Sequence, residues 1–199
     1  MRTLVFVIAC TVVAAPAVWC SNLPLSFEPN RGQATAEVRY LARAGAYTFY
    51  LTVAETLFTR PNQPPLRMKL KGANPSPRVV GENRQSSTSN YFVGNDPGRW
   101  RSSIPNYGSV RCVDVYPGID LVYYGHDAEL EYDWIVSPGA GPQNIRLTFE
   151  GADQVHVDKQ GDMVVKLGDR EYRHRKPAIY QEVSGKRVPV AGDWTWRDH

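Results

Sequence analysis

The chain carries three closely spaced carboxylates, Glu129, Glu131 and Asp133, whose chemistry could be that of an acid–base pair. They alternate with apolar residues through residues 129–136, which is the period of a half-buried strand. On one face of a strand, residues i and i+2 lie roughly 6–7 Å apart, a separation that glycosidase carboxylates also use. The acid and base of a glycosidase usually come from different strands across a cleft, however. We therefore interpret these carboxylates as the solvent face of a strand.

A second acidic group could bind a cation, because oxygen ligands suit Ca²⁺. It contains Asp153, His156, Asp158 and Asp162. The spacing fits no calcium-binding loop, and Asp is common in turns, where its side chain bonds the local backbone. We interpret these residues as turn residues. The histidines show no paired metal-ligand spacing; they are His126, His156, His174 and His199.

No catalytic motif accompanies these residues. The chain has no Gly-x-Ser-x-Gly elbow and no His-Glu-x-x-His sequence. We therefore assign no catalytic, cofactor-binding or metal-binding residue, and we expect neither an enzyme nor a cofactor. A glycoside or peptide hydrolase is the least favoured alternative. The sequence indicates more about fold and destination than about chemistry.

Two further groups could bind a partner. The run Arg173-His174-Arg175-Lys176 could meet acidic polymers or phosphates, although Lys and Arg also guard exposed sheet edges, which is the interpretation that we favour. Aromatic rings could stack on sugars; the candidates are Trp100, Tyr107, Trp194 and Trp196. Most aromatic residues occupy core positions of the alternating pattern. A carbohydrate-binding module is therefore the alternative function and not the first.

The elements that must position these residues are short strands. The chain has 199 residues, with 16 Gly and 15 Pro that punctuate it at short intervals. Residues 119–125 are apolar on both faces, which predicts a strand inside a sheet, and residues 130–136 predict a half-buried neighbour. About a dozen such strands, mostly antiparallel, predict one all-β domain over residues 18–199, a two-sheet β-sandwich or a related arrangement. We expect the polar segment 72–89 to be a surface loop.

The N-terminus carries the pattern of an export signal. Arg2 precedes an apolar run from Leu4 to Ala15 and the small-residue pattern Ala15-Pro16-Ala17. The run is too short to span a bilayer as a helix, so we predict a signal peptide over residues 1–17 that is cleaved after Ala17. An uncleaved N-terminal anchor is the alternative. We expect the mature protein to be secreted, extracellular or at the cell surface, and not to span the membrane.

Net charge and cysteine content bear on possible nucleic-acid partners, disulfides and lipidation. A net charge of +3 is too small to indicate a nucleic-acid partner. Cys10 lies within the leader, which leaves Cys20 and Cys112. Export permits a disulfide between these two, but the strand-like run around Cys112 favours a small buried residue. Lipidation of Cys20 is disfavoured, because Trp19 stands where a small residue is needed.

Several long motifs resemble one family. They are LPLSFEPNRGQ at 23–33, SNYFVGNDP at 89–97, VYPGIDLVYYG at 115–125, LEYD at 130–133, LTFEGA at 147–152 and RKP at 175–177. Together with Trp100 they resemble an uncharacterised bacterial domain that is found at the N-terminus of secreted proteins with SBBP repeats, which are predicted β-propeller repeats. The resemblance covers residues 23–192.

The resemblance implies an all-β extracellular domain without an assigned activity, so no functional residue is carried over. It implies that downstream propeller repeats are one partner, beside a glycan or protein of the cell surface. Family members continue past residues 189–192 with further strands, so we expect the domain to be incomplete at its C-terminal end. The predicted function is a secreted, non-enzymatic module with a structural or adhesive role.

Overall fold

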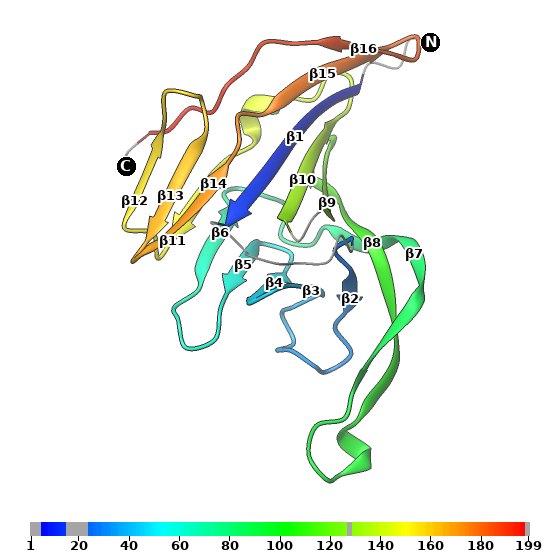
Figure 1. Ribbon diagram of the computed structural model, residues 1–199. Coiled ribbons are helices and arrows are strands. Elements are labelled where there is room, and N and C mark those ends of the chain that lie inside the picture. The colour runs from blue at the N-terminus through cyan, green and yellow to red at the C-terminus, as the bar shows by residue number, and fades with distance from the viewer. Residues whose placement is uncertain (1–4, 15–23, 127–128, 198–199) are drawn as a thin grey trace.

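The computed structural model describes residues 5–14, 24–126 and 129–197, and it is built from β-strands (Figure 1). All recorded pairings between strands are antiparallel, so the predicted all-β, antiparallel class is confirmed. The strands are β1 (Val5–Ala14), β2 (Phe27–Pro29), β3 (Tyr40–Ala44), β4 (Tyr47–Leu51), β5 (Glu55–Thr59), β6 (Leu66–Leu70), β7 (Arg78–Tyr91), β8 (Arg101–Tyr116), β9 (Ile119–His126), β10 (Glu129–Val136), β11 (Leu147–Glu150), β12 (Gln154–Val157), β13 (Met163–Leu167), β14 (Arg170–His174), β15 (Ala178–Val183) and β16 (Lys186–Pro189). Among the described residues, the helical elements are two short 3₁₀ helices, η1 (Pro97–Arg99) and η2 (Pro142–Asn144).

The strands form one large sheet that curls until it is nearly closed (Figure 1). Its hydrogen-bonded order is β11-β6-β5-β4-β3-β2-β8-β9-β10-β1-β14-β13-β12, with β7, β15 and β16 off this path. The β11 end approaches the far side of the path, where the ring of Phe149 lies 5.2 Å from the ring of His174 on β14. Curling of this kind turns the inward faces of distant strands into one core.

The two neighbouring strands predicted at 119–125 and 130–136 are central in the sheet. β9 lies between β8 and β10, as expected of a segment that is apolar on both faces. The inward side chains of β10 are fully buried; they are Leu130, Tyr132, Trp134 and Val136. Alternation predicted the face of each side chain correctly, because a pleated strand turns successive side chains to opposite sides.

The apolar segment at the centre of the predicted leader forms β1. Residues Phe6–Val12 pair with β10, while Val5–Ala9 pair with β15 and Val12–Ala14 pair with β14. Val12 is only 3 % exposed. A run rich in β-branched and aromatic residues has the propensity of a strand as well as the hydropathy of a leader. Export and cleavage after Ala17 stay predictions, and Ala17 lies outside the described residues.

The prediction of a loop over residues 72–89 was wrong for residues 78–89. Residues Arg78–Tyr91 form β7, which pairs along β8 in a hairpin that projects from the sheet (Figure 1). Many β7 side chains are exposed or half-exposed on both faces, so no apolar face marks the strand in the sequence. β7 is stabilised by backbone hydrogen bonds to β8 and not by burial of one of its faces.

A polar cluster and one close contact tie this hairpin to the sheet. The Tyr91 hydroxyl donates a hydrogen bond to Glu28 at 2.5 Å, and Arg43 lies 3.2 Å from the same carboxylate. Burial and the Glu28 hydrogen bond raise the pKa of Tyr91 to about 12, so the hydroxyl keeps its proton. At Gly81 a Cβ atom would lie 2.5 Å from the ring of Tyr107, so only glycine fits there.

Candidate functional site

The three carboxylates of β10 lie on the half-exposed face of this strand, where they contact neighbouring side chains on the surface of the sheet. The Tyr124 hydroxyl of β9 donates a hydrogen bond to Asp133 at 2.8 Å, and Arg175 lies 4.0 Å from Glu129. Burial raises the pKa of Asp133, while the hydrogen bond from Tyr124 acts in the opposite direction. These contacts agree with the interpretation of the three carboxylates as the outer face of a strand.

The acidic residues between 153 and 162 hold turns. One oxygen of Asp158 accepts hydrogen bonds from the amides two and four residues later, at 2.9 and 3.0 Å, and Asp153 accepts one from the Gly168 amide at 2.6 Å. Arg173 of β14 pairs with both Asp158 and Asp162. Burial acts to raise the pKa of Asp158, but the hydrogen bonds from Arg173 and from the turn amides outweigh it and lower this pKa. These contacts agree with the turn interpretation for the three aspartates, whereas His156 lies on β12 (Gln154–Val157) and not in a turn.

The basic run of residues 173–176 does not form one cationic surface. Successive side chains of β14 turn to opposite faces, so Arg173 lies outside while His174 is fully buried. Lys176 lies 2.6 Å from Asp193. Since β14 is paired with both β13 and β1, it is no edge strand, and the edge-guarding interpretation is wrong for the strand as it stands here. The segment that covers this edge is β1.

Cys112 is a buried free thiol on β8. Burial raises the pKa of this thiol to about 12, which keeps it protonated and weakly nucleophilic. This environment agrees with the small-buried-residue interpretation. Cys20 lies outside the described residues, so the alternative of a Cys20–Cys112 disulfide stays untested.

The end of the β7–β8 hairpin exposes three large apolar side chains. Phe92 is 63 % exposed, Val93 68 % and Trp100 39 %. The rings of Phe92 and Trp100 meet edge-on with centroids 5.3 Å apart, and the Trp100 indole N–H donates to the Gly94 carbonyl at 3.1 Å. We call Phe92, Val93 and Trp100 the hairpin tip. It is an apolar surface that is already ordered within its own loop.

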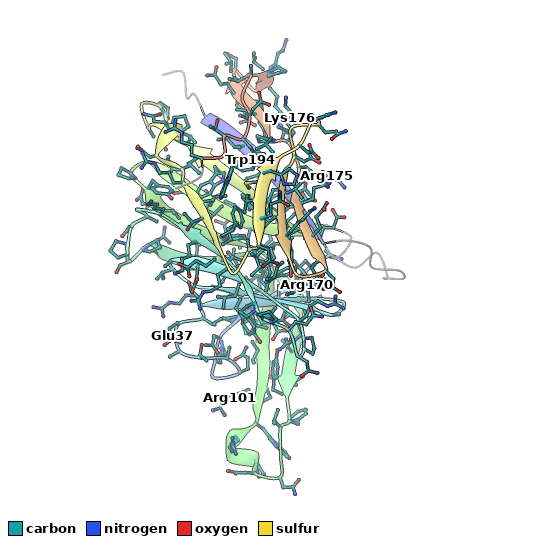
Figure 2. The ribbon with its side chains drawn as sticks, turned by 90° about the vertical axis from the view of Figure 1, so that its left-hand side faces the viewer. Glu37, Arg101, Arg170, Arg175, Lys176 and Trp194 are labelled. Carbon is teal, nitrogen blue, oxygen red and sulfur yellow. The ribbon has the colours of Figure 1, made fainter. Side chains whose placement is uncertain are left out.

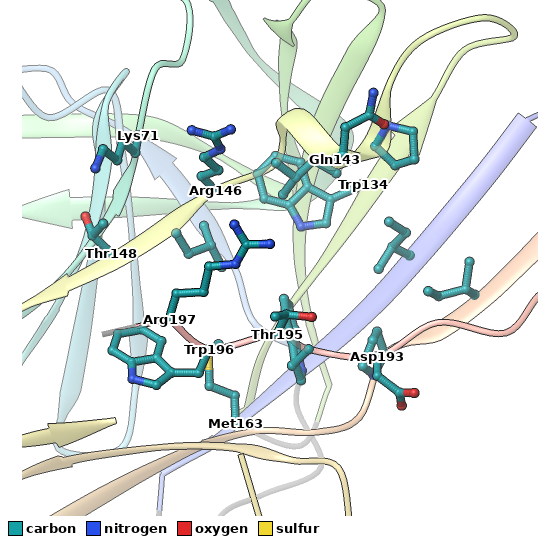
Figure 3. A pocket seen from close by; sticks show the side chains of 17 residues that line it. Lys71, Trp134, Gln143, Arg146, Thr148, Met163, Asp193, Thr195, Trp196 and Arg197 are labelled. Atoms are coloured by element: carbon teal, nitrogen blue, oxygen red, sulfur yellow. The ribbon is translucent and has the colours of Figure 1, made fainter. Parts of the chain in front are cut away.

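A cavity of about 580 Å³ lies among β1, β10, β11, β13, β15 and the C-terminal segment 193–197 (Figure 3). Its apolar wall is formed by Ile8, Trp134, Met163 and Ile179. Two tryptophans of the C-terminal segment, Trp194 and Trp196, line it as well. Trp194 lies near Arg175 (Figure 2), and its indole N–H donates to the Arg175 carbonyl at 3.0 Å, which fixes the segment against the sheet.

The cavity also holds polar groups that suit an anionic ligand. The indole N–H of Trp134 has no hydrogen-bond partner among the described residues, but it is buried and does not reach the open space of the cavity. Lys71, Arg146 and Arg197 line the same cavity, in the left half of Figure 3, and none of them forms a recorded ion pair with another described residue. The Tyr116 hydroxyl donates to the carbonyls of Lys71 and Arg146 at 3.2 Å each, so these two backbones are fixed while their side chains line the cavity.

The four aromatic residues predicted as sugar contacts separate in the structure. Trp194 and Trp196 lie together at the cavity. Trp100 belongs to the hairpin tip, and Tyr107 is half-buried at the base of the hairpin, where it packs edge-on against Tyr40 at 6.1 Å. Alternation indicated their burial only one strand at a time, so it could not tell which of them would share a surface.

Sequence analysis did not single out the cations of the cavity. Lys71 follows β6 and Arg146 precedes β11, and the two strands pair although many residues separate them. No local spacing marks such residues, because they meet only where the two strands lie side by side. Their backbone hydrogen bond, from the Lys71 amide to the Arg146 carbonyl at 2.9 Å, is the contact that brings them together.

A family model described as a domain of unknown function, DUF7948, matches residues 27–199. The chain belongs to the DUF7948 family. This confirms the expected uncharacterised domain, while secretion and SBBP repeats stay predictions. No curated protein and no solved structure matches the chain.

The family match also divides the strands into two sets. It begins at Phe27, the first residue of β2, so the DUF7948 domain contains every described strand except β1. The central position between β10 and β14 is therefore filled by a segment from outside the family domain. No helix in the described ranges of this DUF7948 protein is long and apolar enough to span a bilayer.

Proposed function

We propose that the DUF7948 domain is an exported, non-enzymatic binding module with a structural or adhesive role, placed before propeller-type repeats at the cell surface. The leader pattern of residues 1–17 and the resemblance to domains of secreted repeat proteins support export. The observation that carries the binding role is the hairpin tip, in which three large apolar side chains lie exposed at the end of a projecting hairpin.

The tip has the properties of a contact surface. Exposed apolar side chains that gather in one place favour a partner, because contact removes their area from water. Tryptophan is enriched among the residues that dominate binding energies. The edge-on packing of Phe92 on Trp100 and the indole hydrogen bond fix both rings before contact, so little side-chain entropy is lost on binding.

We expect the double variant Phe92→Ala/Trp100→Ala to lose at least tenfold in affinity for intact cells of the producing bacterium. The reason is that a central aromatic anchor contributes about 2 kcal/mol or more to binding when it is truncated. The measurement is flow cytometry of cells incubated with increasing concentrations of fluorescently labelled protein.

The matched control is Val188→Ala, which removes an exposed apolar side chain (45 % exposed) from β16. We expect this variant to bind as the unchanged protein does. Equal binding by the double variant and the unchanged protein would show that the tip is not the contact surface.

A second function is supported by the cavity, which combines an aromatic wall with cationic side chains. Because Ile8 of β1 lines the cavity, this function belongs to the chain that retains β1. We propose an acidic carbohydrate as its ligand class. Trp194 offers a ring face to a sugar, and Lys71 and Arg146 offer positive charge to a carboxylate.

We expect an oligosaccharide of galacturonic acid to bind more tightly than the galactose oligosaccharide of equal length, as measured by isothermal titration calorimetry. Arg146→Met is expected to weaken binding of the acidic sugar by about tenfold, because a charge-assisted hydrogen bond contributes about 1.5–3 kcal/mol. Only the backbone of Arg146 has recorded hydrogen bonds, so this change leaves the fold intact.

Arg99→Met is the control for the loss of one arginine charge, since Arg99 lies on η1 and does not line the cavity. Binding of the neutral sugar with equal affinity, or an equal loss in both variants, would contradict the acidic-carbohydrate site.

A further inference from the structure

The position of β1 in the sheet is a slot between two strands of the family domain. β10 forms one side, through Phe6–Val12 of β1, and the continuous β14–β15 segment forms the other side. Figure 1 shows β1 running between them. Both neighbours are antiparallel to β1, so they are parallel to each other, and each directs backbone hydrogen-bonding groups into the slot.

The inner wall of the slot is the core of the domain. Tyr132 and Trp134 of β10 and Tyr172 and His174 of β14 are fully buried beside it. Val12 of β1 lies opposite both Leu130 and His174, and only 3 % of its surface is exposed. β1 spans ten residues, and its Ile8 and Val12 pack against the core beside these walls. An empty slot would expose two strand edges and a set of aromatic side chains.

The segment that fills the slot is the one that export would remove. β1 falls within the predicted signal peptide, and the family domain begins only at β2. β14, which pairs with β13 on its other side, becomes an edge strand once β1 is gone. Two separate features, the leader and the family boundary, thus point to the same vacant position.

Simple closure of the slot is opposed by the core. Without β1, β10 and β14 would have to approach by one strand spacing, about 4.8 Å, and pair as parallel strands. Approach would compress an interior that is filled by large rings; Tyr132 of β10 and His174 of β14 already meet across the slot, with their ring centroids 5.9 Å apart. A packed core of this density resists such a change.

We propose that the slot between β10 and β14–β15 is a strand-acceptor site, and that after removal of the leader it binds an extended segment of a partner polypeptide chain. This inference rests on the export that we propose above. The partner segment is antiparallel to β10, spans about the length of β1, and carries apolar residues at alternate positions. Main-chain hydrogen bonds supply affinity, and the inner pockets select the side chains.

The outer face of the slot defines the rest of the partner's pattern. Ala9 and Thr11 lie opposite Asp133 and Glu131 of β10, and Val13 lies opposite Arg173 of β14. Small or hydroxyl-bearing residues therefore suit the alternate positions of the partner strand, and an acidic residue opposite Glu131 or Asp133 is disfavoured by like charge.

The test uses the full chain with a site-specific protease sequence inserted between Ala17 and Val18. The folded chain is cut there and mixed with a fluorescent synthetic peptide of residues 5–14, in which Cys10 is replaced by Ser. We expect the cut chain to exchange its own β1 for the labelled peptide. A second peptide with Ile8→Asp and Val12→Asp is expected to bind about 100-fold more weakly, because it would bury unpaired charges.

Uptake is measured by fluorescence anisotropy and by intact-mass spectrometry under native conditions. The uncut chain is the control and should take up neither peptide. No uptake by the cut chain, or equal uptake of the two peptides, would overturn the acceptor site. A cut chain that releases β1 and then pairs with its own copy as a dimer would overturn the assignment of a different chain as the partner.

Export is read separately, by N-terminal sequencing of the protein recovered outside the cytoplasm of the producing cells. A product that begins at Val18 supports the proposed function. A product that still begins at Met1 would contradict removal of the leader, and the absence of the protein outside the cytoplasm would contradict the proposed export. The peptide exchange of the cut chain would in both cases still report on the slot itself. The two failures are thus distinguishable.

Discussion

Replacement of Trp134 by Ala is expected to lower the free energy of unfolding by about 3–5 kcal/mol, the range for a large aromatic side chain removed from a core. Trp134 is fully buried on β10, and its ring contacts those of Tyr116 and Tyr132 at 6.1 and 6.3 Å between centroids. These neighbours come from different strands of the curled sheet, so the cavity left by the indole cannot collapse by the movement of one side chain.

Urea denaturation followed by circular dichroism measures this loss, with the slope of the transition as a check on two-state behaviour. Trp100→Ala is the matched control, since it removes the same side chain from the exposed hairpin tip, and we expect it to cost about 1 kcal/mol or less. Equal losses in the two variants would show that Trp134 is not part of a packed core.

Trp134→Phe distinguishes the contribution of ring packing to the free energy of unfolding from the cost of the unsatisfied indole donor. Within the part of the chain that the structure describes, the indole N–H of Trp134 has no hydrogen-bond partner, and burial of such a group costs about 1–3 kcal/mol. Phenylalanine removes this cost while it keeps one ring in the core. We expect less than half of the loss that Trp134→Ala causes, measured in the same way.

The second large effect is a loss of stability on mild acidification, caused by His174. Burial lowers the pKa of His174 to about 3 in the folded protein, against 6.5 for an ordinary imidazole. Between these two values the unfolded chain binds more protons than the folded one, so stability falls as the pH decreases from about 7 towards 3. The expected slope is about 1.4 kcal/mol for each pH unit at its steepest.

The measurement is the urea midpoint at pH 7.5 and at pH 5.0, in the unchanged protein and in His174→Asn. The Asn side chain does not titrate, and its amide can replace the imidazole Nδ1, which lies 2.9 Å from the Tyr132 hydroxyl. Carboxylates with lowered pKa values, such as Asp158, lose their contribution at lower pH and are present in both proteins. An identical pH dependence of the two proteins would contradict a neutral, buried His174.

The two binding surfaces can be tested independently because they lie apart. In Figure 1 the β7–β8 hairpin projects from one end of the molecule, and the C-terminal segment that lines the cavity runs along the other. Changes at Trp100 and at Arg146 should therefore add without coupling, as expected for sites that share no contact. An adhesive tip and a sugar-binding cavity are thus compatible in one domain.

Part of the fold was predictable from the sequence by period alone. Tyr132 and Trp134 alternate with carboxylates and are buried as predicted, and residues 119–125, apolar on both faces, form the central strand β9. Turn chemistry was equally local: Gly161 has a φ of 88° in the β12–β13 hairpin, the conformation that glycine adopts without strain.

β7 and the cavity could not be predicted in this way. β7 has no buried face, so its sequence resembles a loop, and only its pairing with β8 makes it a strand. Lys71 and Arg146 meet because β6 and β11 pair, and the order of strands depends on contacts between distant residues.

The sequence by itself determined the class of fold, the faces of the central strands and the apolar N-terminal segment with the pattern of a leader. Only the tertiary structure decided that this segment lies between β10 and β14, and that the cations and tryptophans of the cavity face one space. The physical reason is that alternation is a property of one strand and its solvent, whereas pairing and cavities arise from strands that are far apart in the chain.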